Sequence, residues 1–170
     1  MKLRSSLSTT RCVAAVAMLC AIAAGANAGP AEDLREAEAA AGAGDVHTAM
    51  SLLRKAADKN HPVAQARLAE LLHAAEFDAE ALDLYKRSAA QGEAAGEFGM
   101  GVMYANGAAV KRDDALALDW YRKAEKKNYP PALDAIARAY RTGTLGLPKD
   151  LALANELEAR RKSLLAAAKK

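Results

Sequence analysis

The side chains best suited to metal binding or proton transfer in this chain are three histidines, His47, His61 and His73. They are separated by 14 and 12 residues, and no H-x-x-x-H or H-E-x-x-H pattern occurs. A zinc site on a helix needs two imidazoles on one face, which those short patterns provide and these spacings do not. We therefore expect histidines that are solvated or that cap helices, with no metal site and no cofactor.

The candidate nucleophiles and acid–base groups also lack the surroundings that catalysis requires. Ser51 and Ser88 fall inside expected helices, without the strand-to-helix elbow or the glycine-rich oxyanion loop of a serine hydrolase. Asp113 and Asp114 open an expected helix, where the helix dipole favours negative charge. The loop 143–146 has two glycines but no Gly-Lys-Ser/Thr ending, so it does not indicate a phosphate site. The sequence predicts a protein without enzymatic activity.

The composition favours helices as the elements that carry these side chains. The chain has 170 residues, of which 52% are hydrophobic, only 5% are aromatic and 44 are alanine. Alanine has the highest helix propensity and is depleted in strands. A core so rich in alanine must form between closely approaching helices rather than around large aromatic side chains.

Residues 1–28 have the layout of a secretory signal peptide. Three basic residues and no acidic one lie in 1–11, an apolar run covers 12–24, and 26–28 forms an A-x-A cleavage site. The apolar run rises about 20 Å as a helix, less than the ~30 Å of a hydrocarbon core, so a membrane anchor is the weaker interpretation. We expect cleavage after Ala28, a periplasmic or secreted product, and no membrane span once the signal is removed.

Removal of this segment would also remove both cysteines, Cys12 and Cys20, and three of the 24 Lys and Arg residues. The rest of the chain would have no disulfide, and its basic residues would balance the 21 Asp and Glu. Nucleic-acid binding needs basic side chains that neutralise phosphates, and no basic cluster with interleaved aromatic residues occurs. We therefore expect no nucleic-acid partner.

The sequence after residue 28 contains an internal repeat. The segment ALDLYKRSA of 81–89 recurs 36 positions later as ALDWYRKA in 117–124, and a third copy, AMSLLRKAA, occupies 49–57. A second element places a large, a small and a large apolar residue at i, i+1 and i+4, so they share one helical face. Its first two residues are Leu68-Ala69, Met100-Gly101 and Ile136-Ala137. The small residue should permit close approach of a neighbouring helix.

These repeats, with turn signals between them, predict an all-α fold. The expected helices cover residues 31–42, 45–59, 62–75, 78–91, 94–105, 112–127, 131–141 and 149–167. They pair into four hairpins of one domain, 29–170, near 31–60, 61–92, 93–128 and 129–168. Each hairpin is too small to bury its apolar face alone, so we expect the hairpins to stack into a right-handed α–α superhelix, or solenoid.

The third hairpin carries a resemblance to a known family. The segment 104–107, YANG, followed by Val110, Asp113, Ala117 and the run WYRKA of 120–124, resembles a Sel1-like repeat, a relative of the tetratricopeptide repeat. The resemblance extends over 61–92 and 131–158, where the loop 146–150 is similar, and is poorest over 31–60. Ala109 stands where the family usually has a second loop glycine, and the pair 157–158 replaces an expected Trp-Tyr.

The resemblance implies a non-catalytic adaptor whose concave groove binds a protein or peptide partner in the cell envelope. In such repeats the first helix of each hairpin lines the groove, at positions that flank the apolar element described above. These positions are apolar at the centre and charged at both ends, as a binding groove would be. The candidate groove residues are Glu70, His73, Phe98, Val102, Asn106, Asp134, Arg138 and Arg141.

Two alternatives remain open at this point. Phe98 and Val102 would instead be buried against the next repeat if their faces are misassigned. A weak cell-wall-directed hydrolase or a glycan-binding protein is the alternative function, and it rests only on the Glu70 and His73 pair.

Overall fold

The structure, a computed structural model, describes residues 29–169 and contains eight helices and no strand in that range. The expected signal peptide, with its cleavage site and both cysteines, lies outside the described residues. The helices are α2 (Pro30–Gly42), α3 (Val46–Asp58), α4 (Pro62–Ala74), α5 (Asp78–Ala90), α6 (Ala94–Asn106), α7 (Asp114–Lys126), α8 (Pro130–Thr142) and α9 (Leu151–Ala167). Every expected helix is present, with its ends displaced by two residues at most.

Five of the eight described helices, α3, α4, α6, α7 and α9, begin after a residue whose side chain accepts a hydrogen bond from a backbone N–H of the first turn. Asp113 accepts a hydrogen bond from the backbone N–H of Leu116 at 2.9 Å, and Asp45 and Asp150 do the same for α3 and α9. His61 caps α4 through Nδ1, at 3.4 Å from the backbone nitrogen of Ala64. The capping roles that the sequence predicted for Asp113 and a histidine are therefore confirmed.

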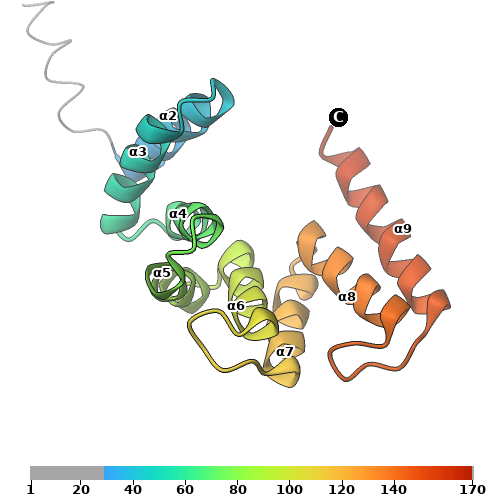
Figure 1. Cartoon of the computed structure of the whole chain (residues 1–170). Helices are drawn as coiled ribbons and strands as arrows, with labels where there is room; N and C mark the ends of the chain where they lie inside the picture. The colour runs from blue at the N-terminus through green and yellow to red at the C-terminus, as the bar shows by residue number, and fades with distance from the viewer. Residues whose placement is uncertain (1–28, 170) are drawn as a thin grey trace, which may run out of the picture.

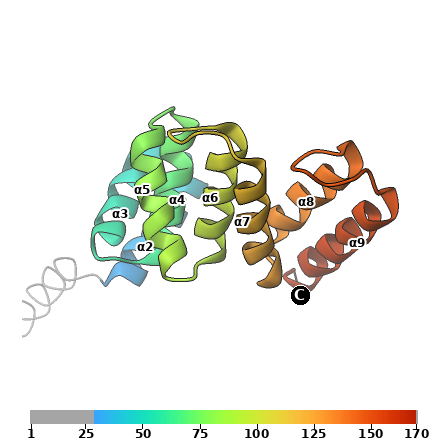
Figure 2. The ribbon, with the colours of Figure 1, turned by 90° about the horizontal axis from the view of Figure 1, so that it is seen from below.

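The helices form four hairpins that follow one another along an arc. Each helix packs against the next one in the chain, and α4 also contacts α6 directly. Helices α2, α4, α6 and α8 lie on the inner side of the arc, while α3, α5, α7 and α9 lie outside (Figure 1). The view from below shows the hairpins in a row, with α8 and α9 at an angle to α4–α7 (Figure 2). This arrangement is the predicted solenoid.

Glycines in α6 allow its two neighbours to approach closely. A Cβ atom added at Gly99 would overlap the ring of Tyr85 in α5. On the other side, a Cβ at Gly101 would lie 2.5 Å from two ring carbons of Tyr121 in α7. The close approach predicted at the small residue of the Met100-Gly101 pair is thus observed. Both tyrosines are only 6% exposed, so their rings join α6 to the hairpin core on either side.

The junctions between hairpins share one backbone feature. Each contains a residue in the left-handed region: Asn60 with φ 62°, Gly92 with φ 77° and Asn128 with φ 58°. Asn and Gly are the residues that adopt this region at least cost, which explains why they recur here. The Asn and Gly residues between the expected hairpins therefore recur because the chain turns there through a left-handed backbone conformation.

A long polar side chain from the following hairpin bonds to each of the last two junctions. Lys127 donates to the carbonyl oxygen of Gly92 at 2.6 Å and pairs with the buried Glu97 at 2.7 Å. Arg160 of α9 donates to the side-chain oxygen of Asn128, also at 2.6 Å. At the first junction, Gln91 and Asn60 are bridged by the buried Gln65. Successive hairpins are therefore joined by polar contacts as well as apolar ones.

The first hairpin contains a buried carboxylate. Asp33 of α2 is fully buried and accepts hydrogen bonds from Lys55 at 2.7 Å and from Lys59 at 2.9 Å, both from the α3 end of the hairpin. These hydrogen bonds hold the pKa of the Asp33 carboxyl below its usual value, although burial acts in the opposite direction. The ion cluster replaces apolar packing at this point between α2 and α3.

No helix within residues 29–169 is both long enough and apolar enough to span a membrane.

Candidate functional site

A hollow of about 240 Å³ opens on the inner side of the arc, between α4, α6 and the beginning of α8. We call it the central hollow. It is lined by Ala66, Glu70, His73, Tyr85, Ala95, Phe98, Val102, Tyr129 and Pro131. Four of the groove residues predicted from the sequence, Glu70, His73, Phe98 and Val102, therefore line one cavity although they belong to two different hairpins.

Phe98 has two roles in this cavity. Its ring centroid lies 5.4 Å from that of Tyr121 and 5.6 Å from that of Tyr129, both in tilted arrangements. These are favourable distances for aromatic pairs. The side chain is half-buried, so it packs between repeats and also presents part of its surface to the central hollow. Phe98 was expected either to line the groove or to be buried against the next repeat, and one face of its ring does each.

Two tyrosine hydroxyls are available to hydrogen-bond a bound molecule. No hydrogen bond within the described residues engages the hydroxyl of Tyr85 or Tyr129, and neither atom is a fully buried group without a partner. Burial raises the pKa of both phenols. Glu70 adds to the increase at Tyr85, whereas at Tyr129 the Arg67 guanidinium opposes it more strongly than Glu70 supports it. Both groups are therefore neutral at physiological pH and can donate as well as accept hydrogen bonds.

The Glu70 and His73 pair does not form a catalytic unit within the described residues. His73 Nδ1 lies 2.6 Å from Asp78 Oδ1, and Glu70 pairs instead with Arg67 at 3.4 Å. A hydrolase of the Ser-His-Asp type needs a nucleophile beside the imidazole. The residues that line the hollow include no serine, threonine or cysteine. Ser88, one of the two serines considered from the sequence, is buried and donates to the carbonyl oxygen of Pro62 at 2.8 Å.

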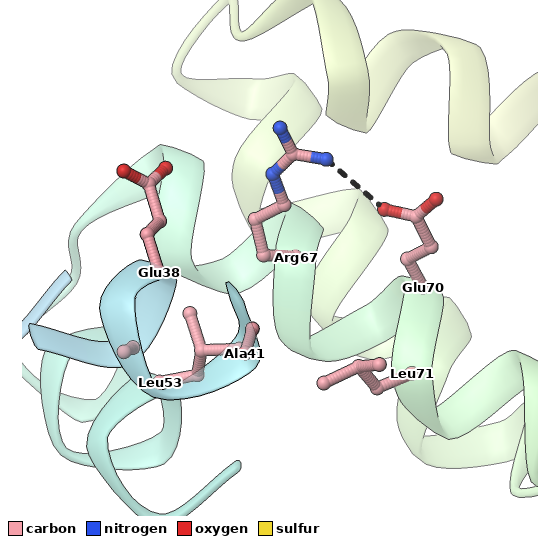
Figure 3. A pocket seen from close by; sticks show the side chains of 7 residues that line it. Glu38, Ala41, Leu53, Arg67, Glu70 and Leu71 are labelled. Atoms are coloured by element: carbon pink, nitrogen blue, oxygen red, sulfur yellow. Dashed lines mark hydrogen bonds and ion pairs between the residues drawn. The ribbon is translucent and has the colours of Figure 1, made fainter. Parts of the chain in front are cut away.

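A second hollow, of about 450 Å³, lies between α2, α3 and α4, and we call it the N-terminal hollow. Ala37, Ala41, Leu53 and Leu71 form its apolar part, and Glu38, Arg67 and Glu70 its polar part. Glu38 and Arg67 stand on opposite helices beside the opening, and the Arg67–Glu70 ion pair lies along α4 (Figure 3). Because Glu70 lines both hollows, they adjoin each other along the inner side of the arc.

The remaining predicted groove residues do not line either hollow. Asn106 is exposed at the end of α6. Arg138 pairs with Asp134 one turn earlier on α8 at 3.2 Å, and Arg141 pairs with Glu158 of α9 at 2.6 Å. The two arginines thus form ion pairs with different acidic residues of this chain.

The sequence patterns did not indicate Tyr85, Tyr129 or the N-terminal hollow as parts of a binding surface. Tyr85 lies in the repeated segment 81–89, and its ring packs against Gly99 as well as lining the central hollow. Tyr129 lies in the junction immediately before the two prolines that begin α8. Its position one residue before a helix on the groove side is a signal that would have found it.

Within the part of the chain that the structure describes, no group of three or more His, Cys, Asp or Glu side chains could hold a metal ion.

Comparison with known proteins defines the class of this repeat. The model of the Sel1 repeat matches residues 42–61, 78–93, 94–129 and 130–157, so the chain belongs to the Sel1 repeat family. Proteins of this family are generally protein-interaction modules built on a non-catalytic scaffold. No curated protein matches the chain.

Two solved structures share the fold. The Sel1 repeat protein from Oxalobacter formigenes has a TM-score of 0.62 and 27% sequence identity, over 68% of this chain and 47% of that one. The second is c5321, a protective antigen present in uropathogenic Escherichia coli strains that displays an SLR fold. Its TM-score is 0.57 and its identity 27%, over 68% of this chain and 26% of its own. The match covers less than half the length of either relative, and it confirms the all-α solenoid.

Proposed function

We propose that this chain is a non-catalytic interaction module that binds a segment of a protein partner along the inner side of its arc. One observation carries the proposal: two adjoining hollows, joined at Glu70, follow the first helices of three successive hairpins. Both hollows have largely apolar linings with charged residues at their edges, which is how surfaces that bind protein segments are composed. Family membership supports the same function.

We also propose that the module acts in the periplasm or outside the cell, with a partner in the cell envelope. The support is the arrangement of residues 1–28, with basic residues, an apolar run and the A-x-A site in order. Mass spectrometry of the product from cells should detect a chain that begins at Gly29. A soluble product that retains Cys12 and Cys20 would contradict the proposed localisation.

Site-specific photo-crosslinking in cells tests the binding surface. Arg67 is half exposed and lines the N-terminal hollow, so a photoreactive benzoylphenylalanine there should be tolerated. The matched control places the same residue at Asp83, which is exposed on α5 at the outer side of the arc. We expect a crosslinked protein from position 67 that is absent from position 83 and diminished by Phe98→Ala. Equal crosslinking from both positions would refute a binding surface on the inner side.

A further inference from the structure

We propose that the central hollow binds a cationic side chain, lysine or arginine, of the partner segment. The inference rests on the proposed function, since it specifies what part of a partner enters this hollow. It is carried by the juxtaposition of three aromatic rings with the carboxylate of Glu70 in one cavity of about 240 Å³.

The rings come from three different elements that the solenoid brings together. Tyr85 belongs to α5, Phe98 to α6, and Tyr129 to the junction before α8. The ring of Tyr129 is tilted by 56° to that of Phe98, so the two rings form walls of different orientation rather than one flat stack. A cation within about 6 Å of a ring centroid is attracted to the ring face, and partial burial strengthens the attraction.

The lining of the hollow includes a carboxylate but no basic residue of the lysine or arginine type. Glu70 lines it, and its side chain is 66% exposed, with one long contact of 3.4 Å to Arg67. His73 also lines it, but its Nδ1 is already bonded to the carboxylate of Asp78. Among the residues that line the hollow, Glu70 is the only carboxylate, and none is a lysine or an arginine.

The arginines near the hollow do not line it, and each pairs with a carboxylate of this chain. Arg67 stands one turn before Glu70 on α4, and its side chain is 52% exposed and linked to Glu70 only through that 3.4 Å contact. On the far side, Arg138 lies near Tyr121, behind Phe98, and pairs with Asp134. An incoming cation can replace Arg67 as the partner of Glu70, because exposed ion pairs of this kind contribute little free energy.

Other occupants fit these groups less well. An acidic side chain would meet Glu70 at short range, with only the Arg67 guanidinium to offset it. A neutral apolar side chain would contact the rings but would leave the carboxylate without a new partner. Lysine and arginine satisfy both groups, because their aliphatic stems contact the rings while the charged end reaches a carboxylate.

Titration with small probes tests the chemistry of the hollow without knowledge of the partner. The probes are n-butylguanidinium and n-butylammonium, with 1-butanol as the neutral control and valerate as the anionic one. Nuclear magnetic resonance would follow the ring signals of Phe98 and Tyr129 in the purified chain. We expect saturable shifts with the two cations at millimolar concentrations, and at least about threefold weaker binding of butanol and valerate.

Three substitutions then separate a specific site from general surface charge. Glu70→Gln should weaken binding of butylguanidinium about three- to tenfold, and Arg67→Gln should strengthen it, because the competing guanidinium is gone. Glu80→Gln is the matched control: Glu80 is a half-exposed glutamate paired with an arginine, Arg54, on other helices. It should leave the affinity unchanged.

The proposal is overturned if butanol or valerate binds as tightly as the cations, if Glu70→Gln has no larger effect than Glu80→Gln, or if no cation shifts the ring signals. None of these results would affect the crosslinking test of the inner surface. Conversely, if the cations bind as expected but position 67 crosslinks to no protein, the hollow is a cation site and the proposed partner-binding function is refuted.

Discussion

Replacement of Ala109 by glycine should stabilise the protein. Ala109 lies in the loop between α6 and α7 and has a φ of 54°, in the left-handed region. An L-residue there costs about 1–2 kcal/mol, because its Cβ crowds the following carbonyl oxygen. Glycine avoids this cost but loses about 0.5–1 kcal/mol more backbone entropy on folding. Since Ala109 is exposed and its methyl group contributes little packing, the free energy of unfolding should rise by about 0.5–1 kcal/mol.

The same substitution at Ala39 is the matched control. Ala39 is also exposed, but it lies inside α2 with helical backbone angles. Glycine there should lower the free energy of unfolding by about 1 kcal/mol. Urea denaturation followed by the fluorescence of Trp120 would measure both values. If Ala109→Gly destabilises the protein as Ala39→Gly does, the left-handed backbone at Ala109 is not a source of strain and the reasoning fails.

Four further substitutions test the packing and the buried carboxylate. Gly101→Ala should lower the free energy of unfolding by about 1–3 kcal/mol in chemical denaturation, because its Cβ would meet the Tyr121 ring and the carbonyl of Ala117. Tyr121→Ala should cost about 3–5 kcal/mol, whereas Lys126→Ala, at an exposed position, should cost a few tenths; equal effects would mean that this helix face is misassigned. The lowered pKa of Asp33 means that its contribution to stability is complete above its usual value of 3.8 and is lost as pH falls through the lower value of the folded state. Asp33→Asn should therefore remove part of the loss of thermal stability on acidification below about pH 4, and an unchanged pH profile would contradict this role.

The fold could be predicted because its determinants are local and repeated. The recurrence of 81–89 at 117–124 fixes a helix and its packing face at once, and the junction residues Asn60 and Asn128 mark turns that only a few residue types adopt. Asp113 and His61 cap the helices that follow them. Such signals depend on neighbours within a few positions, so a single sequence contains them in full.

The candidate site could be predicted only in part, because its geometry depends on contacts between hairpins. Glu70, Phe98 and Val102, which the spacing on α4 and α6 indicated, line the same cavity. The pairing of Arg141 with Glu158 could not be predicted, since it depends on how α9 returns across α8. The N-terminal hollow likewise arises from the separation of α2 and α4, which no pattern in either helix specifies.

The two tyrosine rings seated on the glycines of α6 have a consequence for how this binding surface can change during evolution. In a solenoid, the curvature of the groove is the sum of small rotations between neighbouring helices. Here α6 packs closely against α5 and α7 at its glycines, with Gly99 against Tyr85 and Gly101 against Tyr121. One substitution at either glycine would push the adjacent helix outward and widen the groove several residues away. Partner specificity in such a protein can therefore be altered from within the core, without any change to the residues that touch the partner.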